Sequence, residues 1–264
     1  MDWSKTKTIF IIAFLVLDVF LAIQFFTKQK EANIEIIQKS PIQDQLKQDN
    51  ITYGDLPKID KATYITGKRK EFTKKEIGSL KNQTIVSTQN EGEPVYRLEA
   101  TFDDPITLPE TNPASMLNQF VTENILFGDK YSLWKIEDYQ IIYFQQFEGK
   151  TIFQSILDQN GRIGMVLLRL NEKKEIVSYE QTMLEGIQEI QENENVLSAL
   201  KAIEAAYNAH EISPNSEVSK VELGYFTHIP LSNVQIMAPT WHIVINEKED
   251  IFVNASEGIV SRPD

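Results

Sequence analysis

The sequence predicts an α+β protein: an N-terminal transmembrane helix, then a β-rich ectodomain of two similar lobes, each an antiparallel curved sheet with a packed helix. Three observations lead to this prediction. An apolar run near the N-terminus is long enough to cross a bilayer. Much of the remaining chain alternates apolar and polar residues with the period of a β-strand. A pattern of one amphipathic helix followed by several strands occurs twice.

The apolar run predicts a transmembrane helix over residues 9–27, after a cytoplasmic tail of residues 1–8. Fourteen of the eighteen residues from Ile9 to Phe26 are Ile, Leu, Val or Phe. At a rise of about 1.5 Å per residue, this run approaches the ~30 Å thickness of the bilayer core. The alternative is a cleaved signal peptide. Its apolar core would be shorter, about 7–15 residues, with small residues at a cleavage site, and no such site follows here.

Asp18 lies near the middle of this run, where a carboxylate costs about 3 kcal/mol of insertion free energy. The surrounding apolar residues offset that cost. Ala22 lies one turn further along the same helix face, so the pair suits close helix–helix contact with an interhelical hydrogen bond. The alternative is a protonated Asp18 tolerated by an apolar helix. Four residues near the ends of the run are candidate interfacial anchors: Trp3, Lys5, Lys7 and Lys28.

Charge favours an N-terminus in the cytoplasm and a C-terminal domain outside the cell membrane. Lysines flank the apolar run on both sides, so the positive-inside count is close to a tie. The whole chain carries −12 at pH 7, and its body is more acidic still because the first thirty residues are net positive. An acidic body is repelled by the anionic cytoplasmic leaflet. The chain also contains no cysteine.

The rest of the chain divides into a polar stalk over residues 28–50, with a short helix after Pro41, and two α+β lobes over residues 51–185 and 186–264. Helical spacing from Met116 to Ile125 predicts the first lobe's helix, and spacing from Val196 to Tyr207 predicts the second. A polar, acidic connector is expected between Glu185 and Glu194. The strands expected after the helices cover residues 139–147, 151–157, 164–170 and 175–183, and then 220–228, 240–245 and 251–254. Asn160-Gly161 and the segment beginning at Asn171 carry turn chemistry.

Composition and motifs exclude several classes of function. The net charge of −12 argues against a nucleic-acid partner, and the absence of cysteine excludes a disulfide framework and a thiolate metal site. His210, His228 and His242 have no metal-binding spacing, and the preferred interpretation of His228 and His242 is a solvated strand histidine. Neither a Walker loop, a nucleophile elbow nor a Rossmann glycine series is present. We therefore expect no enzyme activity, no cofactor and no metal.

Two other functions remain open. A cell-wall hydrolase could use paired carboxylates such as Glu99 and Asp103, although Asp103-Asp104-Pro105 is more simply a turn that ends a strand. A cell-surface binding or inhibitor module would also suit repeated α+β units, on fold-level analogy alone.

The opening Met1-Asp-Trp-Ser-Lys-Thr-Lys-Thr-Ile-Phe-Ile, followed by one membrane helix and a cysteine-free β-rich body, resembles the YycI (WalI) family. The order of features in the body, including Phe102-Asp-Asp-Pro and Trp241-His-Ile-Val, is similar as well. The resemblance covers the whole chain in length and layout.

This resemblance implies a regulatory protein of the plasma membrane of Gram-positive bacteria, with its body outside the cell. Together with a YycH-like partner, it would modulate the sensor histidine kinase YycG (WalK) of a two-component system that controls cell-wall metabolism. The family's body resembles the two later domains of YycH. Contacts among transmembrane helices are implied, and the family brings no catalytic residues.

Overall fold

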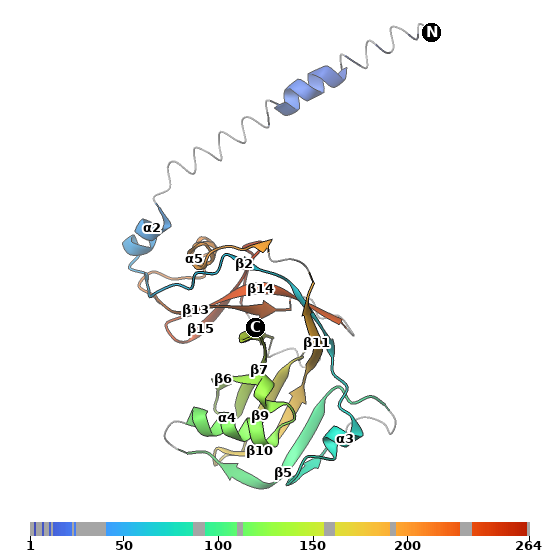
Figure 1. The fold of residues 1–264 in the computed structure, drawn as a ribbon. Helices are drawn as coiled ribbons and strands as arrows, with labels where there is room; N and C mark the ends of the chain where they lie inside the picture. Colours follow the sequence, from blue (N-terminus) through green and yellow to red (C-terminus); the bar gives the residue numbers. More distant parts are fainter. Residues whose placement is uncertain are drawn as a thin grey trace. The chain divides into compact units, whose positions relative to one another are not determined.

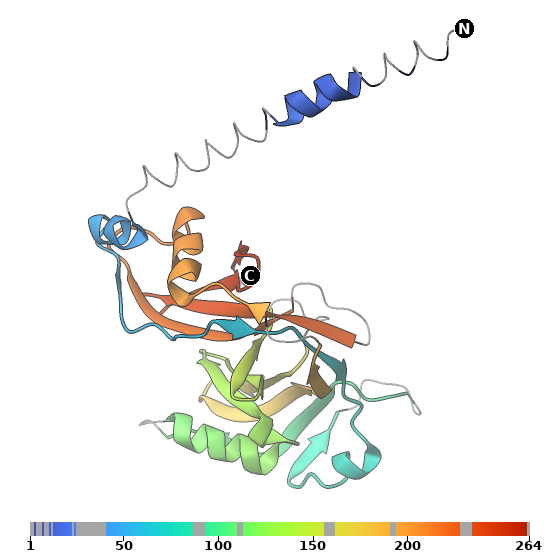
Figure 2. The same cartoon turned by 45° about the horizontal axis from the view of Figure 1, so that its top comes forward.

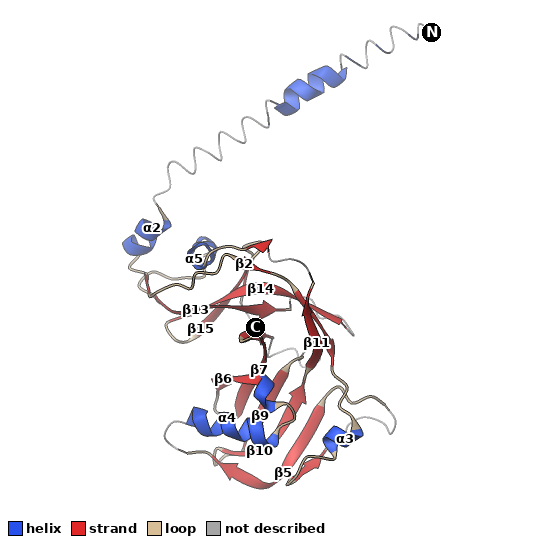
Figure 3. Cartoon of the chain, in the orientation of Figure 1, coloured by secondary structure: helices blue, strands red, loops and turns tan. Residues whose placement is uncertain are grey.

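The computed structural model describes residues 3, 7, 11, 13–22, 24, 41–86, 93–109, 113–155, 162–190, 194–227 and 234–262. These belong to two compact units, Met1–Thr52 and Tyr53–Asp264. Strands dominate the second unit (Figure 3), where a large mixed sheet is combined with few helices among the described residues. The prediction of an α+β fold is therefore confirmed.

In the first unit, residues 13–22 are helical and helix α2 spans Ile42–Gln48. The helix predicted after Pro41 is confirmed, and its first position follows the proline. The predicted membrane span of residues 9–27 lies only partly within the described residues, as does the predicted stalk. Within the described part of the chain, no helix has both the length and the apolar character needed to cross a membrane. The transmembrane helix thus stays a prediction.

The elements from the boundary of the second unit onward run in chain order as follows: β1 (Thr52–Tyr53), β2 (Lys61–Ala62), β3 (Ile65–Arg69), α3 (Lys74–Ile77), β4 (Gln83–Ile85), β5 (Leu98–Thr107), α4 (Pro113–Asn124), η1 (Gly128–Lys130), β6 (Tyr131–Ile136), β7 (Gln140–Phe147), β8 (Lys150–Phe153), β9 (Met165–Leu170), β10 (Glu175–Thr182), β11 (Leu184–Glu189), β12 (Glu194–Asn195), α5 (Ala199–Asn208), β13 (Glu217–Phe226), β14 (Val234–Ile245), β15 (Glu249–Asn254) and β16 (Val260–Ser261).

One connected sheet follows the order β11-β3-β14-β13-β8-β7-β9-β10-β5-β4. Figure 1 labels β13 and β14 of this order, and β7, β9, β10 and β5 further along it. Strand β6 adds to β7, β15 adds to β14, and β12 pairs separately with β2. Along this path only the β8–β13 pairing is parallel, with Ile152 opposite Tyr225. The parallel pair therefore joins two antiparallel halves, β3 and β11 lying in the half that contains β13 and β14.

Strands β7 and β9 are buried on both faces, which explains their nearly continuous apolar sequence. On one face, Tyr143 and Val166 pack in a cluster with Leu117, Phe120 and Val121 of helix α4. On the other face, alternate residues of the same strands pack against Phe226 and Phe252 of the other half. Figure 2 shows α4 lying along the sheet. The apolar residues whose spacing predicted this helix form the face that α4 buries.

Helix α5 packs on strands β14 and β15 of the other half. The hydroxyl of Ser198 caps it by accepting from the Lys201 backbone N–H. Ala202, Ile203 and Ala206 form its buried stripe. The buried Trp241 of β14 donates its indole N–H to the Leu197 carbonyl just before the helix, at 2.8 Å. Both predicted helices are therefore confirmed, each on its own part of the sheet.

The strands predicted after each helix are confirmed as β7–β10 and β13–β15, with ends shifted by a few residues. At Asn171, the side-chain oxygen accepts from the backbone N–H groups of Lys173 and Glu175, which confirms the predicted turn. The predicted Asn160-Gly161 turn and the end of the strand predicted to reach Leu157 lie outside the described residues, as does His228.

The segment predicted as a polar connector between Glu185 and Glu194 is polar, but it contains strands, which the prediction missed. Strand β11 pairs with β3, and β12 pairs with β2. The sequence of this segment is typical of a linker because its polar side chains face solvent. The backbone pairing and the packing of Ile187 against a buried cluster hold it in the sheet. The lobe boundary predicted at residues 185 and 186 stays a prediction.

The prediction that Asp103-Asp104-Pro105 ends a strand is wrong, because β5 continues to Thr107. The register against β10 jumps between two pairs, Ile176–Ile106 and Ser178–Thr101. The acidic residues and the proline fall within this irregularity. Proline has no N–H for a ladder and is found at such bulges. The residues favoured at turns therefore produce a bulge here, while the strand resumes beyond it.

Candidate functional site

The predicted site residues fall in the first unit. Asp18 and Ala22 are both helical and exposed, four residues apart and therefore on one helix face. Trp3 is 72% exposed, and Lys7 Nζ lies 5.5 Å from the centre of its ring. Lys5 and Lys28 lie outside the described residues. The roles proposed for these six residues stay predictions.

A buried histidine is the centre of a polar cluster in the second unit. His242 of β14 is 1% exposed. Its Nδ1 lies 3.0 Å from Glu222 Oε1 on β13, and its Nε2 lies 2.8 Å from Asp250 Oδ1 on β15. Both ring nitrogens of His242 are therefore within hydrogen-bond distance of a carboxylate oxygen. The sequence-based interpretation of His242 as a solvated residue is wrong.

Sheet register explains how these three residues meet. Glu222 is directly opposite His242 in the β13–β14 ladder. Asp250 is opposite Val244, one same-face position along from His242. The spacing along the chain gives no sign of this arrangement. The only signal is that Trp241-His-Ile-Val lies in a run with almost no alternation, which is typical of a strand buried on both faces.

Aromatic rings from both halves of the sheet surround the imidazole. Its centre lies 4.7 Å from that of the Trp134 ring, 5.0 Å from Phe153 and 5.1 Å from Phe252. Trp134 belongs to β6 and Phe153 to β8, whereas Phe252 belongs to β15. His242 therefore lies at the contact between the two antiparallel halves.

The carboxylate of Glu222 is shared between the side chains of His242 and Lys220. Lys220 Nζ lies 2.7 Å from the same Oε1 that faces His242. Partial burial would raise the pKa of Glu222, but the hydrogen bonds and charges of His242 and Lys220 outweigh burial and hold this pKa below its usual value. Glu222 is therefore ionised at neutral pH.

A cavity of about 350 Å³ opens beside this cluster. Its wall includes Trp134 of β6, Gln146 of β7, Thr151 of β8 and the three members of the His242 cluster. The β8–β13 pairing brings these strands together, so the cavity depends on the contact between the two halves.

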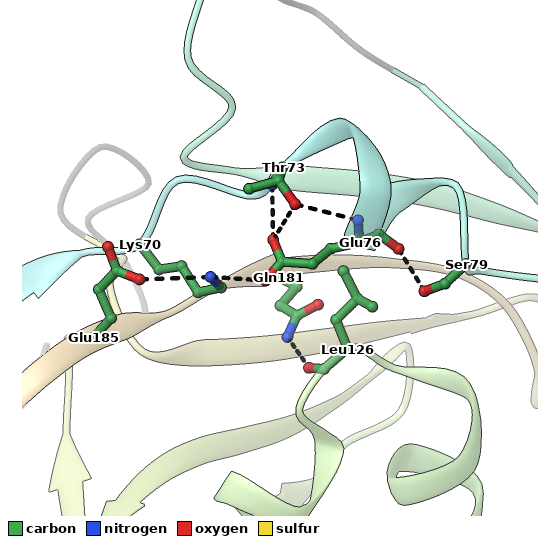
Figure 4. A network of polar contacts seen from close by, with 7 residues as sticks. All are labelled: Lys70, Thr73, Glu76, Ser79, Leu126, Gln181 and Glu185. Atoms are coloured by element: carbon green, nitrogen blue, oxygen red, sulfur yellow. Dashed lines mark hydrogen bonds and ion pairs between the residues drawn. The ribbon is translucent and has the colours of Figure 1, made fainter.

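A second polar network connects β3, α3 and β11 (Figure 4). Lys70 Nζ lies 3.0 Å from Glu76 Oε1 and 3.5 Å from Glu185 Oε2. Glu76 also accepts from the backbone N–H and the hydroxyl of Thr73, and the Thr73 hydroxyl accepts from the Glu76 N–H, which completes a capping box. Beneath it, the Gln181 amide donates to the Leu126 carbonyl at 2.6 Å. This network holds the segment after β3, helix α3 and strand β11 together.

The spacing of Glu99 and Asp103 does not favour their use as a hydrolytic pair. Glu99 and Asp103 are four residues apart on β5. Along a strand this is about 13 Å, beyond the ~5–9.5 Å that separates the paired carboxylates of glycoside hydrolases. In the described residues, no group of three or more His, Asp or Glu side chains is placed to hold a metal ion.

The model of the YycI protein family matches residues 30–256 of this chain. The chain belongs to the YycI family. The match covers most of the chain and contains both the His242 cluster and the Lys70 network. YycI membership supports a regulatory protein of the YycFG two-component system, in a family that is not known as an enzyme family. The matched residues begin after the N-terminal apolar run.

A search of curated proteins gives no match. Among solved structures, the crystal structure of an uncharacterized protein from Eubacterium rectale ATCC 33656 is similar to this YycI chain, with a TM-score of 0.49 and 9% sequence identity. The alignment covers 82% of this chain and 92% of that one.

Proposed function

We propose that this YycI protein is a membrane-anchored extracytoplasmic regulator of the YycFG sensor histidine kinase. It acts with a YycH-like partner, through contacts of its N-terminal helix and of its ectodomain. The observation that carries the proposal is the family match over residues 30–256. The N-terminus is cytoplasmic, the C-terminal domain is extracellular, and the kinase regulates cell-wall metabolism.

The side chains of the N-terminal helix support the membrane anchor. Residues 13–22 include apolar side chains on every side of the helix, among them Phe14, Val16 and Phe20, which are 61%, 61% and 55% exposed. A helix that is apolar all round is stable where something apolar covers it, either a protein core or a bilayer. The bilayer serves this purpose for an anchor.

A regulator can shift a kinase between two states only if it contacts them unequally. A polar Asp18 beside the small Ala22 provides such a contact, because a close neighbouring helix can hydrogen-bond to the carboxyl group in one state and lose the bond in the other. Bonds of this kind contribute about 0.6–2 kcal/mol in membranes. That is enough to change a balanced two-state population several-fold.

The test is co-purification of the full chain with the kinase and the YycH-like protein from membranes. We expect Asp18→Leu to reduce recovery of the kinase several-fold and to change its autophosphorylation. Val19→Leu is the matched control, since it alters a neighbouring apolar side chain on another face. An unrelated apolar helix in place of residues 9–27 should abolish regulation. Normal binding and regulation after that replacement would show that the helix is only a tether.

A further inference from the structure

The cavity beside His242 has no part in the proposed helix contacts. It is formed by strands from both halves of the sheet, with β6, β7 and β8 on one side and β13, β14 and β15 on the other. Its volume of about 350 Å³ falls at the lower end of the ~300–1,000 Å³ range of small-molecule sites. The cavity is thus large enough for a small ligand that touches both halves at once.

Charges in the lining balance, although the chain as a whole carries −12. Three ammonium groups and three carboxylates contribute: Lys135, Lys220, Lys248, Glu222, Glu247 and Asp250. Lys220 and Glu222 already neutralise each other at 2.7 Å. A balanced lining gives no net attraction for a phosphate-like anion or for a polycation. The charges therefore select for a ligand that is neutral and rich in hydrogen-bonding groups.

Two carboxylates of the lining have acceptor capacity for such a ligand. Glu222 and Asp250 each use one oxygen for His242, and their side chains are 31% and 20% exposed. A carboxylate has two oxygens, and the second of each can accept from a hydroxyl. The hydroxyl of Thr151 and the amide of Gln146, at the same wall, supply both donors and acceptors.

Trp134 provides an aromatic part of the wall, beside the apolar Leu133 and Val244. Its ring is partly buried and held 5.1 Å from Phe144 and 4.7 Å from His242, centre to centre. The flat ring is therefore fixed before a ligand binds, which lowers the entropy cost of binding. An indole next to charged hydrogen-bond acceptors matches a pyranose ring, which has C–H groups on its faces and hydroxyl groups around its edge.

We propose that this cavity binds a neutral saccharide, with Trp134 against a sugar ring and Glu222 and Asp250 accepting from its hydroxyl groups. His242 is 1% exposed, and both of its ring nitrogens face the two carboxylates, so it offers no polar atom to the ligand. It is a positioning residue that holds the two carboxylates in place. Because the ligand contacts β6 and β13–β15 together, binding stabilises the contact between the halves. The site is independent of the helix contacts proposed above, so either proposal can fail alone.

The test uses the full chain in a detergent without a sugar headgroup, and N,N′-diacetylchitobiose as the probe. Saturation-transfer NMR reports which ligand protons touch the protein, and titration gives the dissociation constant. The dipeptide Ala-Ala, a smaller zwitterion, serves as the competing ligand. We expect the disaccharide to bind and the dipeptide not to bind.

Two variants locate the site. Asp250→Asn removes the charge of one accepting carboxylate of the lining, and Trp134→Phe replaces the indole with a smaller aromatic ring. Each should weaken binding about tenfold, as loss of one charged hydrogen bond or of ring contact does. Lys201→Ala, on the exposed face of α5, is the matched control and should leave binding unchanged. Absence of disaccharide binding, preferential dipeptide binding, or equal binding by all three variants would overturn the proposal.

Discussion

At the residue scale, a glycine allows the two halves of the sheet to join, because it has no side chain. Gly224 lies on β13, where a Cβ atom would be 2.4 Å from the Thr151 carbonyl oxygen and 2.4 Å from Phe153 Cε2. The first neighbour is backbone of β8 and cannot rotate away. Glycine is therefore the residue that permits the close parallel approach of β8 and β13.

We expect Gly224→Ala to lower the free energy of unfolding by about 1–3 kcal/mol, the usual cost of forcing extra volume into a packed region. Chemical denaturation of the full chain measures it. Gly54→Ala is the matched control, because nothing lies within 4 Å of a Cβ there. Equal stability of the two variants would contradict the close approach.

The Lys70 network gives a pH-dependent contribution. The backbone hydrogen bond from Thr73 is the largest cause that lowers the pKa of Glu76; burial opposes it, and Lys70 lowers it further. Because this pKa is below its usual 4.5 in the folded chain, the stabilisation is complete above that value and is lost as the pH falls through the folded pKa.

We therefore expect Glu76→Gln to cost about 0.5–1 kcal/mol at pH 7, since glutamine keeps the capping geometry but loses the charge that faces Lys70. The difference from the unaltered chain should shrink below pH 4.5, the usual pKa of the carboxyl group. Thermal unfolding between pH 3 and 7 measures this trend. Glu172→Gln, in an exposed turn, should show no such difference, and a gap of constant size for Glu76→Gln would refute the ionic contribution.

At the element scale, helices α4 and α5 could both be predicted. Each buries one face, and the sequence shows this as apolar residues that repeat with a period of 3.6. Strands β7–β10 could be predicted from their short apolar and β-branched runs and from the turns between them. The polar segment around β11 could not be predicted, since its place in the sheet depends on backbone pairing with β3, more than a hundred residues earlier. The pattern of side chains along a segment does not indicate which other segment its backbone will pair with.

The assignment of β11 to the sheet can be tested at Ile187, which packs beside a buried cluster. We expect Ile187→Ala to destabilise the fold by about 1–2 kcal/mol through lost apolar burial. Ile190→Ala is the control, because Ile190 is 44% exposed. If both substitutions were neutral in denaturant unfolding, the segment would behave as the solvated connector that the sequence suggested.

At the scale of the whole molecule, the central question is on which side of a membrane the body lies. We expect a reporter that is active only outside the cytoplasm to be active when it is fused to the C-terminus of the full chain. The same fusion should be inactive when residues 1–27 are deleted, because the apolar run then no longer directs export. Activity of a cytoplasm-specific reporter on the full chain would contradict both the topology and the proposed anchor.

The sequence by itself determined the α+β class, the two amphipathic helices, most strands and the resemblance to YycI. Each of these depends on local periodicity or on contiguous residues. Only the tertiary structure decided that β8 and β13 pair in parallel, that the bulged β5 runs past Pro105, and that His242 is buried between Glu222 and Asp250. The physical reason is sheet register. Residues 20 positions apart become hydrogen-bonded neighbours when strands align, and alignment depends on the packing of the whole molecule.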